Sequence, residues 1–196
     1  MTDMDILHTI RCQLVPLDER PERFVCAENT FKNDRTCKVV NAGMHGCDFR
    51  GVIPPAIKEL KNLKALRLSG NELTKVEYLD ELPELKVVDL SENYITSLDK
   101  LGNIPTVSLE NNEVTEIKDS GNITAIYLDG NKLTEIKDTG NIEMLHVERN
   151  PVKSLDMDAI VNSRLKEIHL GSSKIKMQAC FDASGKLKEG GISLYC

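Results

Sequence analysis

The sequence predicts a solenoid, in which short turns of chain stack side by side and their strands form one parallel sheet. Two observations support this fold class. A pattern recurs of apolar, two variable residues, apolar, variable, apolar, two variable residues, asparagine, variable, apolar. Within each copy the fourth and sixth places are apolar and the places between them polar, which is typical of a strand with one buried face. Clear copies begin at Leu63, Leu85, Ile104, Ile123, Ile142 and Leu165, and a weaker one at Val39.

The asparagine of the pattern comes directly after each predicted strand, where the chain has to turn. Its amide can both donate and accept hydrogen bonds, so it can satisfy backbone groups that a buried turn would leave unpaired. We therefore predict a ladder of stacked side chains along the core. Its members are Asn71, Asn93, Asn112, Asn131 and Asn150, with Cys47 in the corresponding place of the first copy and Ser173 in that of the last.

The spacing of the ladder predicts how the opposite, convex side is built. Cys47 and Asn71 lie 24 residues apart, Asn71 and Asn93 lie 22 apart, and the next three intervals are 19 residues each. A turn of 19 residues has too little chain for a helix after its strand, so we predict extended or single-turn 3₁₀ segments there. Each apolar side chain that they bury stabilises the fold by roughly 1.5–3 kcal/mol. The side chains in question are Leu98, Ile117, Ile136 and Leu155.

The two ends of the 196-residue chain differ from its middle, because all six cysteines lie outside the regular repeats. A solenoid exposes its apolar column at both ends and needs caps, and disulfide-stapled caps are typical of oxidising compartments. We expect one domain, with an N-terminal cap over 1–38, about seven repeats over 39–175 and a C-terminal cap over 176–196. The pairing that we prefer is Cys26–Cys37, Cys12–Cys47 and Cys180–Cys196. Other pairings are possible, and if Cys47 is a free ladder member, an odd thiol remains.

Composition and motifs argue against several classes of function. The net charge of −6 argues against binding to nucleic acid or to an anionic membrane surface. No apolar run reaches the roughly 18 residues of a transmembrane helix. We find no Gly-x-Ser-x-Gly, His-Glu-x-x-His, glycine-rich phosphate loop or Cys-x-x-Cys, so we predict no enzyme and no cofactor. The first residues are not a secretory signal, so the chain is either cytosolic or a mature chain with an added Met1, and the cysteines favour the second.

The repeats resemble those of the leucine-rich repeat family, most of all its extracellular members, over about residues 37–175. Residues 49–57 are similar to the plant-type Leu-x-Gly-x-Ile-Pro extension, and Cys26 to Cys37 followed by two valines resembles the paired-cysteine cap of that branch. From Asn71 onward the extension disappears and the repeats shorten. The resemblance implies an α/β-type solenoid: a right-handed coil with a parallel β-sheet on its concave face, mostly non-helical convex turns and disulfide-stapled caps.

The concave face is where such solenoids bind their partners, and its outward residues can be named from the pattern. Its centre is acidic around Tyr127, with Arg67 toward one end, which predicts a basic protein or peptide partner with Tyr127 as an anchor. A merely solvated sheet face is the alternative. The candidate partner-binding residues are Arg67, Asp89, Glu110, Tyr127, Asp129, His146, Glu148 and His169.

Two further features are weaker indications of function: a pair of histidines and one glycosylation acceptor. His146 and His169 lie on neighbouring predicted strands near Glu148 and Glu167 and would make a conceivable metal site, but exposed histidines without a metal are commoner, so we predict none. Their ordinary pKa of about 6.5 would make binding pH-sensitive. Asn122, in Asn-Ile-Thr, is one N-glycosylation acceptor.

The sequence therefore favours a non-enzymatic extracellular recognition module, either secreted or the ectodomain of a surface protein, which binds a protein or peptide. An intracellular scaffold or regulatory subunit is an alternative. An inhibitor of a secreted hydrolase is another, because the resemblance of the first repeat to the plant type allows it.

Overall fold

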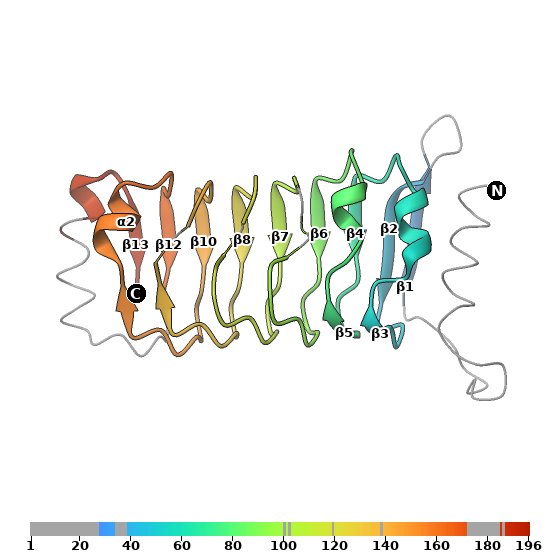
Figure 1. Cartoon of the computed structure of the whole chain (residues 1–196), viewed down its shortest axis with the longest axis horizontal. Coiled ribbons are helices and arrows are strands. Elements are labelled where there is room, and N and C mark those ends of the chain that lie inside the picture. Colours follow the sequence, from blue (N-terminus) through green and yellow to red (C-terminus); the bar gives the residue numbers. More distant parts are fainter. Residues whose placement is uncertain are drawn as a thin grey trace.

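A single sheet runs along the long axis of the elongated molecule (Figure 1). The computed structural model describes residues 28–33, 39–99, 101, 103–118, 120–137, 139–171, 185 and 187–196. Within them, the sheet has nine strands, and all neighbours are parallel except β1 and β2. In spatial order the strands are β1 (Glu28–Asn33), β2 (Val39–His45), β4 (Ala65–Arg67), β6 (Val87–Asp89), β7 (Thr106–Ser108), β8 (Ala125–Tyr127), β10 (Met144–His146), β12 (Glu167–His169) and β13 (Ser193–Tyr195).

The return segments depend on the length of the turn, as the spacing predicts. The longer turns hold the 3₁₀ helices η1 (Pro55–Glu59) and η2 (Leu79–Glu81) and the short helix α2 (Met157–Val161). In the 19-residue turns between β7 and β10, the described residues contain no helix. Two small parallel ladders complete the coil: β3 (Arg50–Val52) pairs with β5 (Glu72–Lys75), and β9 (Glu135–Ile136) pairs with β11 (Ser154–Leu155).

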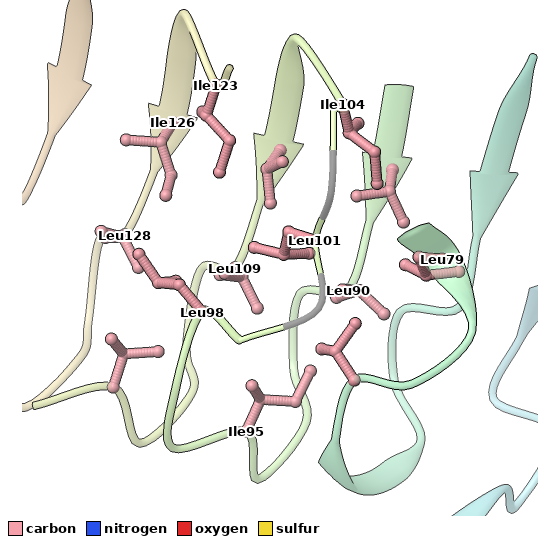
Figure 2. Packing of buried hydrophobic residues seen from close by; sticks show 14 of the residues in the cluster. Leu79, Leu90, Ile95, Leu98, Leu101, Ile104, Leu109, Ile123, Ile126 and Leu128 are labelled. Atoms are coloured by element: carbon pink, nitrogen blue, oxygen red, sulfur yellow. The ribbon is translucent and has the colours of Figure 1, made fainter. Parts of the chain in front are cut away.

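The core is one aliphatic column that follows the sheet from turn to turn (Figure 2). The middle residue of each strand is in register with its neighbours, so that Val107, Ile126 and Leu145 stack and are fully buried. Leu98 and Ile136 are buried as predicted. Ile117 and Leu155 are only partly buried and pack against the column.

The predicted asparagine ladder is confirmed for Asn71, Asn93, Asn112, Asn131 and Asn150, which are all buried. Asn112 shows the pattern that the others share. Its Nδ2 donates to the carbonyls of Leu90 at 2.9 Å, Leu109 at 3.1 Å and Glu110 at 3.2 Å, while its Oδ1 accepts the backbone N–H of Ile95 at 2.9 Å. Each amide therefore joins its own turn to the preceding one. Ser173 lies outside the described residues.

The residue before each ladder position has a left-handed backbone, which the sequence pattern does not predict. The φ angles are 58° at Gly46, 65° at Gly70, 57° at Glu92, 54° at Asn111, 69° at Gly130 and 52° at Arg149. Three of these residues carry side chains, for which positive φ is costly. The turn after the strand thus imposes one backbone conformation on residues as different as glycine, glutamate, asparagine and arginine.

The two ends of the sheet are extended by segments that we expected to act as caps. The antiparallel β1 lies beside β2, and β13 lies in parallel beside β12 with Leu194 opposite Ile168. Cys47 and Cys196 each belong to a disulfide whose other cysteine lies outside the described residues. Cys12, Cys26, Cys37 and Cys180 lie outside the described residues, so the pairing of all six stays a prediction. No helix in the described part of the chain combines the length and the apolar character needed to cross a bilayer.

Candidate functional site

The strand register brings the predicted binding residues together on the exposed face of the nine-stranded sheet, which we call the sheet face. Successive strands align Arg67, Asp89, Ser108, Tyr127, His146 and His169 in one row. Glu110, Asp129 and Glu148 each follow their strand by two residues and form a second row beside it. All eight predicted residues are exposed or partly exposed. Whether they bind a partner stays a prediction.

The sheet face carries charge of one sign between β6 and β12. A third outward row is formed by the first residue of each strand. Between β6 and β12 the three rows contain Asp89, Glu110, Asp129, Glu148 and Glu167 and no lysine or arginine, while Arg149 is exposed in the turn directly after Glu148. Neighbouring strands lie about 4.8 Å apart, so these carboxylates produce a common negative potential. Two of them also have a local role, since Asp129 Oδ1 accepts the N–H of Glu148 at 2.6 Å and Asp89 Oδ1 accepts that of Ser91 at 3.1 Å.

Four rings from four neighbouring strands stack on the sheet face, and we call them the aromatic row: Tyr127, His146, His169 and Tyr195. Their successive centroids are 4.8, 3.9 and 4.3 Å apart, and the last two pairs are nearly parallel, at 10° and 13°. Sequence reasoning missed Tyr195, because it lies in the segment assigned to the C-terminal cap. The alternation of Ile192 and Leu194 with polar neighbours is the signal that could have revealed its strand.

The two histidines of the row have different surroundings. His169 Nε2 lies 2.6 Å from Glu167 Oε1, and its Nδ1 lies 4.0 Å from Glu148 Oε1. Burial lowers the pKa of His146 from its ordinary value of 6.5, and the nearby His169 lowers it further, whereas Asp129, Glu167 and Glu148 act in the opposite direction. Burial of the His146 ring therefore favours its neutral form.

The ligand atoms of His146, Glu167 and His169 lie within 4.8 Å of one another. However, the two imidazole planes are nearly parallel at a centroid distance of 3.9 Å. Ring-nitrogen lone pairs lie in the ring plane, so those of parallel rings run side by side and do not converge on one ion at the 2.0–2.1 Å that zinc requires. The arrangement favours ring stacking over shared coordination.

A shallow hollow of about 360 Å³ lies on the sheet face over β6, β7 and β8, beside the aromatic row. Sequence reasoning did not predict it, since its shape depends on small side chains in two successive strands. It is lined by Val87, Val88, Asp89, Ser91, Thr106, Ser108, Glu110 and Tyr127.

The glycosylation acceptor Asn122 lies at an exposed turn before β8. Its Nδ2 donates to Oδ1 of Asn103 at 2.6 Å, and the hydroxyl of Thr124 donates to the carbonyl of Pro105 at 3.1 Å. Its exposure is compatible with modification, which stays a prediction.

Comparisons with known proteins identify the repeats. A family model described as "Leucine Rich repeats (2 copies)" matches residues 61–103. Internalin C2 of Listeria monocytogenes is 22% identical with a TM-score of 0.63, over 80% of this chain and 70% of that one. The leucine-rich repeat domain of a Shigella effector is 16% identical with a TM-score of 0.55, over 80% of each chain.

A functional domain of InlJ from Listeria monocytogenes, which includes a cysteine ladder, is 19% identical with a TM-score of 0.55. The match covers 71% of this chain and 31% of that domain, so this chain spans about a third of its length. At these identities the likeness to solved structures concerns the fold. No curated protein matches the sequence.

Proposed function

We propose that this chain, which is a leucine-rich repeat protein, is a non-enzymatic recognition module outside the cytosol that binds a basic protein or peptide on its sheet face. Domains built from such repeats generally bind other proteins, and stacked repeats provide an extended surface for a partner. The module is either a secreted protein or part of a cell-surface protein.

One observation carries the proposal: five carboxylates and no lysine or arginine occupy the three outward rows between β6 and β12. A patch of one sign attracts partners of the opposite sign and repels those of the same sign. The partly exposed side chain of Tyr127 and the exposed Val87 add apolar contact area that a purely solvated face would not need.

The cysteines support a location of the protein outside the cytosol. All six lie outside the regular repeats, and Cys47 and Cys196 each belong to a disulfide. Disulfides persist in oxidising compartments and are rare in the cytosol. For protein purified from its natural source, we expect no free thiol under denaturing, non-reducing conditions. Six reactive thiols would instead support an intracellular scaffold or regulatory subunit.

Selection from a random peptide library on the immobilised protein tests the binding face. We expect the selected peptides to be rich in lysine and arginine. Their affinity should fall about tenfold in the double variant Glu110→Lys/Glu148→Lys, because two exposed ion pairs are lost and two repulsions added. Asp129 is left unchanged since its carboxylate also holds the N–H of Glu148.

A matched control carries the same change of charge away from the sheet. Glu59 at the end of η1 and Glu84 in the turn after η2 are exposed, and Glu59→Lys/Glu84→Lys should leave the affinity nearly unchanged. Equal losses in both double variants would show an effect of net charge alone and contradict a binding site on the sheet face.

A further inference from the structure

The aromatic row ends at Tyr127, because the next residue in register on β7 is Ser108. His146 lies against one side of the Tyr127 ring at a centroid distance of 4.8 Å. On the other side, the small Ser108 side chain leaves room, and this is where the hollow over β6, β7 and β8 begins. Tyr127 is thus the ring of the row that borders the hollow.

The hollow combines an apolar floor with negative charge. Val87, with 40% of its surface exposed, and Thr106 contribute methyl groups. Asp89 and Glu110 contribute carboxylates, and neither forms an ion pair within the described part of the chain.

The remaining polar groups of the hollow are largely satisfied. The hydroxyls of Ser91 and Ser108 bond to each other at 2.7 Å, and one oxygen of Asp89 accepts the N–H of Ser91. The other Asp89 oxygen and the Glu110 carboxylate are available to a ligand. The hollow therefore offers hydrogen-bond acceptors to a cation with several N–H donors.

We propose that this hollow binds an arginine side chain of the partner; the proposal rests on the function inferred above and specifies its chemistry. A guanidinium is planar, so it can lie on the face of Tyr127 while its N–H groups bond to the carboxylates of Asp89 and Glu110. Its weak hydration and its aliphatic stem suit the apolar floor. A lysine ammonium is compact and strongly hydrated, and it lacks the flat surface for stacking on the ring.

Two short peptides serve as probes: acetyl-Ala-Arg-Ala-amide and acetyl-Ala-Lys-Ala-amide. Each is titrated into the ¹⁵N-labelled full chain and followed by amide shifts in NMR spectra. We expect the arginine peptide to bind about threefold to fivefold more tightly than the lysine peptide, the factor of an exposed cation–π contact. The largest shifts should lie at Asp89, Ser108 and Tyr127.

Variants separate stacking from charge. Tyr127→Leu should make the two peptides bind equally, whereas Asp89→Asn/Glu110→Gln should weaken both. Tyr94→Leu, at a tyrosine with 54% of its surface exposed and outside the sheet strands, is the matched control and should keep the arginine preference. The NMR spectrum of each variant reports whether it is folded.

The outcomes distinguish this proposal from the broader function. If both peptides bind equally to the unchanged protein, or if Tyr127→Leu keeps the preference, the arginine site is wrong while a basic partner on the sheet face stands. If neither peptide shifts any amide of the sheet face, both proposals fail.

Discussion

The asparagine ladder and the aromatic row both run across the parallel sheet and overlap at β8 and β10, but their roles differ. The ladder is buried, has the same residue in five successive turns, and each amide makes hydrogen bonds to two turns. The aromatic row is half-exposed, is built from two residue types, and stops after Tyr127. A position that must be the same in every turn serves the fold. The outward position at the end of each strand is not fixed by the fold. Because it carries an aromatic ring in four neighbouring strands, it is available for binding.

The largest effect is expected from breaking the ladder in the middle. Asn112→Ala leaves the buried N–H of Ile95 without its acceptor, and a buried unsatisfied group costs about 1–3 kcal/mol. The carbonyls of Leu90, Leu109 and Glu110 also lose a hydrogen bond, but each keeps a second donor. We expect a loss of about 2 kcal/mol in the free energy of unfolding, measured by urea denaturation. Asn111→Gly, at the exposed neighbour with positive φ, is the control and should not destabilise. A loss below about 1 kcal/mol for Asn112→Ala would mean that water replaces the amide and that the ladder contributes little.

A smaller effect of opposite sign is expected one position before the ladder. Arg149 precedes Asn150 and has a φ of 52°, which glycine adopts without strain. Arg149→Gly should stabilise the fold by up to about 1 kcal/mol, because relief of the left-handed strain exceeds the entropy that glycine adds to the unfolded chain. Thermal unfolding of the variant measures the gain.

The reverse change provides the check. Gly130 has a φ of 69° and holds the same place one turn earlier, and a side chain at this φ is strained whatever space surrounds it. Gly130→Ala should therefore destabilise the fold. If both changes shift stability in the same direction, the left-handed turn does not explain the preference at this place.

The smallest effect is expected from the aromatic row, since its rings are partly exposed. The pKa of His146 is lower in the folded chain than its ordinary value of 6.5, so the unfolded chain takes up a proton first as the pH falls. Stability should thus decrease as the pH drops through 6.5 toward the folded pKa and stay level below it. His146→Gln should remove this part of the pH dependence, as seen in denaturation midpoints at about pH 7.5 and 5. Identical pH profiles would contradict the effect of burial on this ring.

The repeat pattern predicts much of the candidate site. It misplaces or misses other residues for physical reasons. Period two separates inward from outward residues, so Asp89, Tyr127 and His146 could be placed in one row before the structure was known. Tyr195 could not, because its strand lacks the asparagine that marks the others. Spacing alone predicts Ile117 and Leu155 in the core, but both are only partly buried against it, because spacing does not specify how deeply a side chain enters.

The sequence by itself determined the turns, the ladder and the acidic character of the outward rows, because each depends on residues at fixed spacing within one repeat. Only the tertiary structure decided which outward side chains touch. The stacking of His146 on His169, the addition of Tyr195 from the C-terminal segment, and the hollow beside Tyr127 all depend on contacts between turns. Such contacts follow from strand register and side-chain rotamers, which no single repeat specifies.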